Sequence, residues 1–372
     1  MTSEPTNGLF SPIRIGEMDL KHRVVMAPLT RLRADQATDV PTDLMLEYYA
    51  QRVSDGGLII SEATSITPDN RGYLGAPGIY SDAQIAGWAR ITDAVHAKGG
   101  YIYQQLWQVG RTSHEDLNGG LAPVAPSAIP YDGLAYTKNG WVPATPPRAL
   151  SEEEVGAVVE LYRAAAARAK AAGFDGVEIH AANGYLPDQF LQDSANKRSD
   201  RYGGSIENRA RFLLEVVAAV KSVWGSNRYA VRLSPSGTFN GMGDSNPDAL
   251  FDHVAKKLDE AGLSYLHIVE PRVKGSVDVE GMERPVATSR LRQLFRAPII
   301  SAGGYDGEKA DSVIAAGDAD LVAFGRHFIA NPDLPQRLRD GAALNRYDRD
   351  TFYGGTEKGY TDYPFLQALA AE

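Results

Sequence analysis

Short runs of apolar residues alternate along the chain with longer segments in which apolar residues recur every three or four positions. Eight such runs are rich in Val, Ile, Leu and Tyr, a pattern typical of strands buried in a parallel sheet. They are Arg23–Ala27, Gly57–Ser61, Tyr101–Leu106, Gly176–His180, Tyr229–Leu233, Ser264–Val269, Pro298–Ser301 and Asp320–Phe324. We therefore expect eight parallel strands with helices between them.

Helix starts are predicted in the segments between these runs. Ser81 with Gln84, and Ser151 with Glu154, fit the capping box. In this motif two side chains bind free N–H groups at the start of a helix. Each pair precedes a predicted helix, so the expected alternation of strand and helix gains local support.

Two further helix starts are expected where an asparagine precedes a proline, at Asn246-Pro247 and Asn331-Pro332. The asparagine can cap a helix whose first residue is the proline. Apolar stripes at helical spacing follow elsewhere, and glycines that suit helix ends stand where such patterns stop. The stripes are Leu213, Val217, Val220 and Trp224, and Leu250, Val254, Leu258 and Ala261; the glycines are Gly99, Gly173, Gly225 and Gly262.

This alternation, with no Pro- or Ser-rich linker between two halves, favours a fold of the α/β class. We expect a single (β/α)8 TIM barrel that spans residues 1–372 as one domain. The alternative is an open doubly wound sheet, but the Gly-x-Gly-x-x-Gly turn typical of that fold is absent. Two stretches are longer than the alternation of strand and helix requires. The Pro- and Gly-rich segment Trp107–Leu150 is expected to be a long loop after the third strand, and the residues after Asp340 form an extension.

Composition excludes several kinds of site. The chain of 372 residues has no cysteine, which rules out thiol nucleophiles, redox disulfides and cysteine-bound metals. Lys and Arg number 38 against 47 Asp and Glu, a net charge of −9 that does not favour nucleic-acid binding. Met1–Gly8 lacks the apolar stretch of a signal peptide, and no window approaches the ~18 apolar residues of a membrane span. We expect a cytoplasmic protein that binds neither membranes nor nucleic acid.

Polar and aromatic residues follow the predicted strands at their carboxyl ends, where barrel enzymes build their active sites. The fourth run leads into His180, Asn183 and Tyr185. Hydrogen-bond donors on one turn suit the polarisation of a carbonyl or nitro oxygen. One histidine and one amide are too few ligands for a metal, and no Gly-x-Ser-x-Gly elbow of a serine hydrolase occurs.

Two further features indicate an anionic ligand. The alternation of side chains turns Glu178, His180 and Arg232 into the barrel, where an unpaired guanidinium is costly. Arg232 therefore pairs with Glu178 or another carboxylate, or faces a bound ligand that carries or develops negative charge; both alternatives stay open. Gly303-Gly304 and Gly325-Arg326 follow the last two strands, where barrels commonly hold a phosphate.

Several motifs, in the same order along the chain, resemble those of the Old Yellow Enzyme family of flavin-dependent ene-reductases. They are Val25–Arg31, His180–Tyr185, Tyr202–Ser205, Asn208–Arg211, Phe324–Arg326, Asn331–Leu334, Phe352–Gly355 and Gly359–Pro364. The similarity extends from about Leu9 to Pro364. It implies a TIM barrel that holds one tightly but non-covalently bound FMN, with NADPH or NADH as hydride donor.

The resemblance also implies roles for single residues. Arg232 is expected beside the N1/O2 edge of the flavin, Gln105 at its pyrimidine edge and Thr30 near O4. The other residues expected to bind FMN are Pro28, Leu29, Ala63, Gly303, Gly304, Gly325 and Arg326.

The implied reaction has two halves in one site. After NADPH or NADH has reduced the flavin and left, an electron-poor alkene binds, such as an enone, a maleimide or a nitroalkene. His180 and Asn183 are expected to bind its carbonyl or nitro oxygen, and Tyr185 to protonate its α-carbon as general acid. The expected pocket walls are Tyr73, Trp107 and Tyr353, with a packing role left open for Tyr73.

Some positions depart from the family's pattern. Asn183 stands where relatives have His or Asn, and because an amide does not titrate, we expect weak pH dependence from this residue. Gln108-Val109 replace a His-Thr pair of many relatives, Pro187-Asp188 lie in a turn that is often more apolar, and the 111–147 loop is the least similar stretch.

The same residues also allow two rival functions. One is a cofactor-free lyase or isomerase that uses His180 as a base on a phosphorylated substrate. The other is a flavin-storage protein in which the polar cluster is incidental. For the leading interpretation, we expect a monomer or a weak homodimer.

Overall fold

The computed structural model describes residues 8–274, 277–279 and 287–366. All eight predicted strands are present and form a closed parallel barrel, because each pairs with the next along the chain and the last pairs with the first. They are β3 (Val24–Met26), β4 (Leu58–Ile60), β6 (Tyr101–Trp107), β11 (Gly176–Ala181), β12 (Tyr229–Leu233), β13 (Tyr265–Val269), β16 (Ile299–Ala302) and β17 (Leu321–Phe324). The open doubly wound sheet is thereby excluded, and the TIM-barrel prediction is confirmed.

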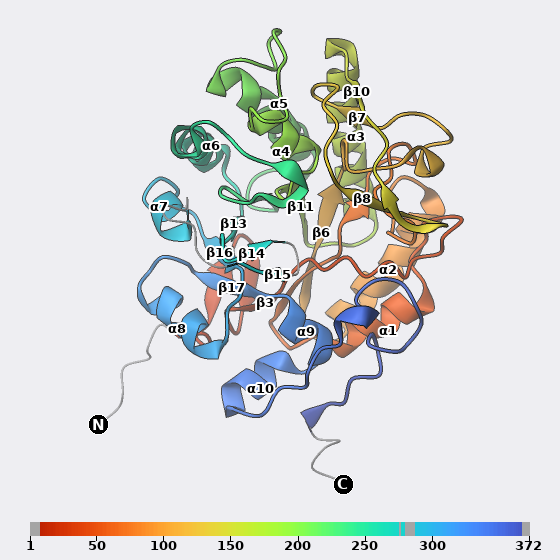
Figure 1. Cartoon of the computed structure of the whole chain (residues 1–372). Helices are drawn as coiled ribbons and strands as arrows, with labels where there is room; N and C mark the ends of the chain where they lie inside the picture. Colours follow the sequence, from red (N-terminus) through yellow and green to blue (C-terminus); the bar gives the residue numbers. More distant parts are fainter. Residues whose placement is uncertain (1–7, 275–276, 280–286, 367–372) are drawn as a thin grey trace.

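Helices surround this barrel (Figure 1). They are α1 (Asp43–Gln51), α2 (Asp82–His96), α3 (Glu152–Ala171), α4 (Leu186–Leu191), α5 (Ile206–Trp224), α6 (Pro247–Ala261), α7 (Thr288–Arg292), α8 (Gly307–Ala315), α9 (Arg326–Ala330) and α10 (Leu334–Asp340). In the described part of the chain, no helix is both long and apolar enough to cross a membrane.

The predicted helix starts are confirmed except for one. Ser81 and Ser151 form complete capping boxes, and Asn246 caps α6 with Pro247 in its first turn. The prediction for Asn331-Pro332 is wrong, because α10 begins only at Leu334.

Asn331 has a different task, since it directly follows α9. Its side chain donates to the backbone oxygen of His327 at 2.8 Å and accepts the N–H of Asn345 at 2.7 Å. The amide side chain thus joins the end of one short helix to the C-terminal extension instead of capping the next helix.

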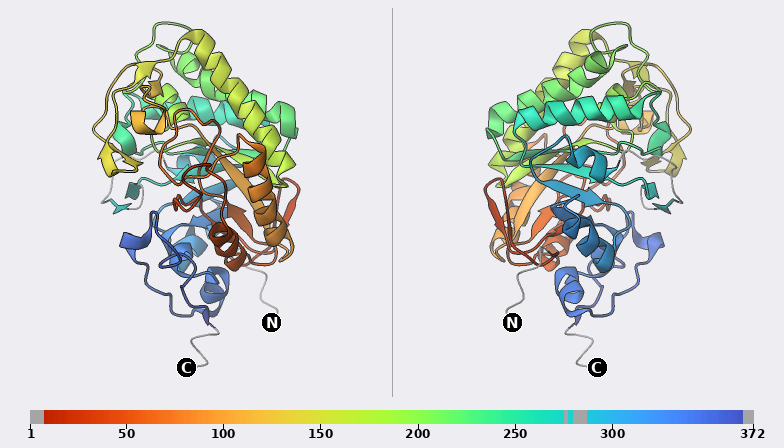
Figure 2. Two further views of the ribbon diagram at one scale, coloured as in Figure 1. Left: turned by 90° about the vertical axis from the view of Figure 1, so that its right-hand side faces the viewer. Right: turned by 90° about the vertical axis from the view of Figure 1, so that its left-hand side faces the viewer.

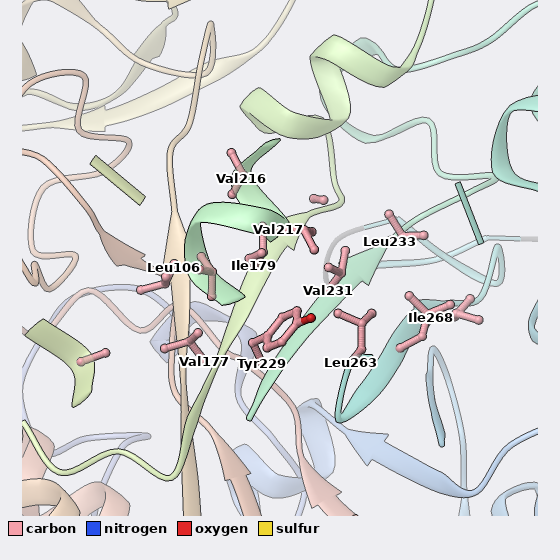
Figure 3. Close-up of a cluster of buried hydrophobic side chains, with 14 of the residues drawn as sticks. Leu106, Val177, Ile179, Val216, Val217, Tyr229, Val231, Leu233, Leu263 and Ile268 are labelled. Atoms are coloured by element: carbon pink, nitrogen blue, oxygen red, sulfur yellow. The ribbon is translucent and has the colours of Figure 1, made fainter. Parts of the chain in front are cut away.

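Side chains alternate along β11 and β12 as predicted. Val177 and Ile179 on β11, and Val231 and Leu233 on β12, pack in the apolar layer between barrel and helices, which α5 enters with Val216 and Val217 (Figure 3). Burying each of these side chains contributes on the order of 1.5–3 kcal/mol. This layer fixes the register that turns Glu178, His180 and Arg232 inward.

The amino end of the barrel is closed. A hairpin of β1 (Ile13–Ile15) and β2 (Met18–Leu20) packs with inward-facing apolar residues of the barrel strands in a second core. The carboxyl ends of the strands are thus left as the place for a site, as in other barrels.

The long segment after β6 contains more regular structure than its sequence indicates. It holds the short helix η1 (Glu115–Leu117), a parallel pair of β7 (Val124–Ala125) and β10 (Arg148–Ala149), and a hairpin of β8 (Leu134–Thr137) and β9 (Gly140–Pro143). The hairpin is attached to the segment around Leu74, because the Leu74 N–H donates to the Tyr136 backbone oxygen at 2.8 Å.

The C-terminal extension is held by three buried arginines. Arg31, Arg33 and Arg52 donate mainly to backbone oxygens, including those of Phe352 and Tyr360. Together with α9 and α10, the extension lies at the opposite end of the molecule from α3 and α5 (Figures 1 and 2). The remaining short elements are β5 (Thr64–Ser65), η2 (Phe239–Gly241), β14 (Val273–Lys274), β15 (Val277–Asp278) and η3 (Arg349–Thr351).

Candidate active site

A cavity of about 950 Å3 opens at the carboxyl ends of the barrel strands. Most of the residues that the sequence predicted for the site line it, although they come from distant parts of the chain. They are Pro28, Leu29, Thr30, Tyr73, Gln105, His180, Asn183, Tyr185, Arg232, Gly303, Gly304, Gly325, Arg326 and Tyr353.

Ala63 and Trp107 lie behind the cavity wall. Both are buried and pack in one cluster with Tyr73 and Tyr185. The ring of Trp107 stands at 89° to that of Tyr185, with 5.1 Å between centroids, and lies 5.6 Å from the ring of Tyr73. Trp107 therefore supports two aromatic residues of the wall.

His180 stands at the end of β11 as an uncharged group. Burial holds the pKa of its imidazole well below the usual range, and the nearby cations Arg232 and, if protonated, His267 act in the same direction. Its Nδ1 atom is buried without a hydrogen-bond partner among the described residues. A neutral imidazole in this position can donate a hydrogen bond without carrying charge into the cavity.

Asn183 and Gly184 follow in two successive left-handed conformations, with φ of 59° and 74°. All four of their backbone polar groups bind side chains. The Asn183 N–H donates to Ser234 and its oxygen accepts from Asn240, while the Gly184 N–H donates to Asp188 and its oxygen accepts from Gln189, over distances of 2.7–2.9 Å. A Cβ at Gly184 would lie 2.6 Å from that of Asn240, so only glycine fits.

Tyr185 is 6% exposed and remains a protonated phenol. Burial raises its pKa well above the usual range, and the neighbouring phenols of Tyr73, Tyr131 and Tyr353 add to this shift. Its ring meets that of His180 at 74° with centroids 4.8 Å apart. Uncharged donors are thus gathered at His180, Asn183 and Tyr185, which we call the donor end of the cavity.

Arg232 lines the cavity from β12 and has no ion-pair partner within 4.0 Å among the described residues. Its Nε atom is also buried without a hydrogen-bond partner there. Burial lowers the pKa of Arg232 and the Glu178 carboxylate opposes that shift, so that the guanidinium stays charged. Of the two alternatives left open by the sequence, direct pairing with Glu178 is excluded.

Glu178 has its own partners inside the barrel. His267 Nδ1 lies 2.9 Å from one carboxylate oxygen and Gln105 Nε2 donates to the other at 2.8 Å. Burial raises the pKa of Glu178, but His267, Arg232 and Gln105 outweigh it and the net shift is downward. Arg232 thus has a counter-charge in the barrel, while its own donors remain available to a ligand.

Glycine backbone and positive charge occur together elsewhere in the wall. Gly303 has a φ of 126°, and a Cβ there would lie 3.0 Å from that of Glu270, which favours glycine. Gly304, Gly325 and Arg326 line the same region. We call these four residues the anion end, because close backbone and a guanidinium suit a phosphate.

Arg326 forms an ion pair with Asp278 that the sequence did not indicate. Its guanidinium binds the Asp278 carboxylate through two hydrogen bonds, of 2.7 and 2.5 Å. Lys309 lines the cavity as well. No sequence motif pointed to Asp278 or Lys309, because Asp278 reaches the site from a short hairpin and Lys309 from a helix.

Trp141 is another wall residue that the sequence did not reveal. It extends from β9 and is 44% exposed. Its ring lies 5.5 Å from that of Tyr73 and 5.7 Å from that of Tyr353. In the sequence, only the unusual length of the segment around Trp141 indicated a functional role, and it did not point to any single residue.

The arrangement suits a flat, partly anionic ligand and a second, polarisable one. Arg232 offers a charge, the donor end offers uncharged hydrogen bonds, and the anion end suits a phosphate. Among the described residues, no group of three or more His, Asp or Glu side chains could hold a metal ion.

Comparison with known proteins gives several matches. The sequence matches the family described as NADH:flavin oxidoreductase / NADH oxidase over residues 8–345. The flavin oxidoreductase hxnT of Emericella nidulans is 48% identical, in an alignment of 384 positions that covers 98% of this chain and 99% of the relative. Morphinone reductase in complex with tetrahydroNAD has a TM-score of 0.90 at 51% identity over 98% of each chain. The Old Yellow Enzyme homologue of Zymomonas mobilis has a TM-score of 0.92 at 46% identity, covering 96% of this chain and 100% of its own.

Proposed function

Because the chain belongs to the NADH:flavin oxidoreductase / NADH oxidase family, the family of Old Yellow Enzyme, we propose that it is an FMN-dependent ene-reductase. Its substrates are electron-poor alkenes, namely enones, maleimides and nitroalkenes, and NADPH or NADH is the hydride donor. One observation carries the proposal: a buried arginine with no ion-pair partner among the described residues lines the same cavity as three uncharged donors.

The residues present fit FMN. The Nε atom of Arg232 lacks a partner among the described residues, which suits a ring edge that becomes negative on reduction. Thr30 and Gln105 line the same cavity, and Pro28 and Leu29 would contact the ring. The anion end would hold the phosphate. When bound, the flavin supplies the hydride chemistry that the side chains of this protein lack.

The donor end would act on the alkene. His180 and Asn183 donate hydrogen bonds to its carbonyl or nitro oxygen and stabilise the negative charge that develops there. Since His180 is neutral, it does so without a full positive charge in the cavity. Tyr185, which is protonated throughout the neutral range, gives its phenolic proton to the α-carbon.

The first test is flavin content followed by reduction. Purified protein is expected to show a flavin absorbance band that NADPH or NADH bleaches. Protein without that band, even after FMN is added, would contradict the proposal and favour the cofactor-free lyase or isomerase. A flavin that is bleached but not reoxidised by any enone, maleimide or nitroalkene would favour flavin storage.

A further inference from the structure

Asp188 is a fully buried carboxyl group directly behind the turn that carries Asn183 and Tyr185. It belongs to α4 and has no role in the chemistry proposed above. Its Oδ2 accepts the N–H of Gly184 at 2.8 Å, and its Oδ1 accepts a side-chain N–H of Gln192 at 2.7 Å. Asp188 therefore holds the backbone from which the donors project.

Ser234 connects Asp188 to the turn a second time. Its hydroxyl oxygen accepts the Asn183 N–H at 2.7 Å and directs its proton towards Asp188 Oδ2, 3.4 Å away. With the proton on that side, the hydroxyl's lone pairs are free for the Asn183 N–H. Asp188 thus acts on both N–H groups of the left-handed pair, on Gly184 directly and on Asn183 through Ser234.

These contacts suit the ionised carboxylate. Gly184, Ser234 and Gln192 all present donors to it, and an ionised carboxylate is purely an acceptor. A protonated carboxyl group would bring a further donor into the same space, where Gln192 is the partner that could turn its amide oxygen to accept it. Protonation therefore disturbs the contacts that hold the turn.

We propose that Asp188 is a positioning residue for the alkene half of the reaction: its ionised form fixes the peptide groups beneath Asn183 and Tyr185, and its protonation loosens them. The inference rests on the proposed function and adds to it a pH-sensitive control that lies outside the cavity. With this control, alkene reduction is faster once Asp188 is ionised.

The surroundings of Asp188 place its titration near neutrality. Burial raises the pKa of Asp188 to about 7, against the opposing hydrogen bonds from Gln192, Gly184 and Ser234. Among the described residues, Arg111 is the charged group that acts on it, and this too opposes the upward shift. The guanidinium of Arg111 donates to backbone oxygens and so stays where it is.

The donors themselves do not titrate near that pH. The pKa of His180 lies well below the usual range and that of Tyr185 well above it, while Asn183 is an amide. A matched control is Glu62, another buried carboxyl group whose pKa burial raises to about 7. Glu62 binds the Arg31 N–H and the Tyr49 hydroxyl, and within the described part of the chain its carboxylate makes no hydrogen bond to the turn.

The experiment compares the holoenzyme with its Asp188→Asn and Glu62→Gln variants. After reduction with NADPH, each protein is mixed anaerobically with 2-cyclohexenone, and flavin reoxidation is timed from about pH 5 to about pH 9. We expect the wild-type rate to rise roughly tenfold across an inflection near the Asp188 pKa. Asp188→Asn should lack this inflection, Glu62→Gln should keep it, and the rate of flavin reduction by NADPH should be similar in all three.

An inflection that survives in Asp188→Asn, or that disappears in Glu62→Gln, would overturn the inference. An infrared titration gives a readout apart from activity. The wild type should show protonated-carboxyl absorbance that titrates near neutrality, with one component from Asp188 and one from Glu62. The Asp188 component should be missing from Asp188→Asn and remain in Glu62→Gln. If the wild type reduces no alkene, the proposed function fails, while this component still reports whether Asp188 titrates.

A second variant covers the case in which Asp188→Asn does not fold. Gln192→Leu removes a donor that favours the ionised carboxylate, so it should move the inflection and the infrared titration to higher pH. If the midpoints of the rate inflection and of the infrared titration are both unchanged in Gln192→Leu, the proposed role of Asp188 is contradicted.

Discussion

The donor end and the anion end of the cavity differ in what fixes them. Tyr185 is 6% exposed, and it follows two residues whose four backbone polar groups all bind side chains. At the anion end, the ion pair of Arg326 and Asp278 lies nearer the surface, with side chains 17% and 61% exposed. Directed hydrogen bonds and a proton transfer need groups held in place, whereas a phosphate can be held by charge and close backbone.

This difference predicts that the two ends affect separate steps. Changes at the donor end should slow the alkene half of the reaction and leave FMN in place. Changes at Arg232 or at the anion end should release FMN and leave the surviving holoenzyme able to reduce alkenes.

Tyr185→Phe should slow flavin reoxidation by an enone by about 10³-fold, because it removes the proposed proton donor. Flavin reduction by NADPH should change little. Stopped-flow measurement of both halves checks this, with Tyr101→Phe at the start of β6 as the control. Equal slowing of both halves would break the comparison.

Arg232→Leu should weaken FMN binding by about 100-fold, because it removes the charge proposed to face the flavin. The measurement is FMN retained after dialysis, together with the potential of whatever flavin remains, which should fall. Arg290→Leu, on α7, is the control, since that arginine pairs with Asp252 away from the cavity. Unchanged FMN content and potential would contradict the placement of Arg232.

Ionisation of the buried Asp188 should lower the free energy of unfolding as the pH rises. Its pKa is about 7 in the folded chain and about 4 when unfolded, so between these values the folded state binds more protons. The free energy of unfolding therefore falls across that window and levels off above it. Asp188→Asn should gain about 2–3 kcal/mol relative to the wild type between pH 5 and pH 8. A difference that stays constant with pH, in thermal or urea unfolding, would contradict this.

Asp278→Asn should give the smallest effect. It frees Arg326 for the phosphate, so FMN should bind about threefold more tightly, and less so at high salt, because the pair is partly exposed. Fluorescence titration of the apoprotein with FMN at two salt concentrations measures this. Weaker binding would show that Asp278 supports the anion end rather than competing with its ligand.

Much of the barrel could be predicted from the sequence, because local patterns determine it. Alternation along β11 turned Glu178 and His180 inward, and the capping boxes at Ser81 and Ser151 marked helix starts. At Asn331 the same local reasoning failed, since the tertiary contact with Asn345 decides its role.

Other parts of the site depend on contacts between distant segments and left no local pattern. Asp188 stands next to the donor motif, yet its contact with Ser234 joins residues of different strands and helices. Trp141 meets Tyr73 and Tyr353 only when two loops and the C-terminal extension come together. A sequence motif can show which part of the chain contributes to the site, but the contacts between distant residues are visible only in the folded chain.

The most direct test of the account is an anaerobic single turnover. Holoenzyme reduced with one equivalent of NADPH is mixed with 2-cyclohexenone, and both the flavin absorbance and the product are measured. We expect the flavin to be reoxidised completely and one equivalent of cyclohexanone to form per flavin. A flavin that stays reduced with this enone, and with a maleimide and a nitroalkene as well, would contradict the proposed ene-reductase function.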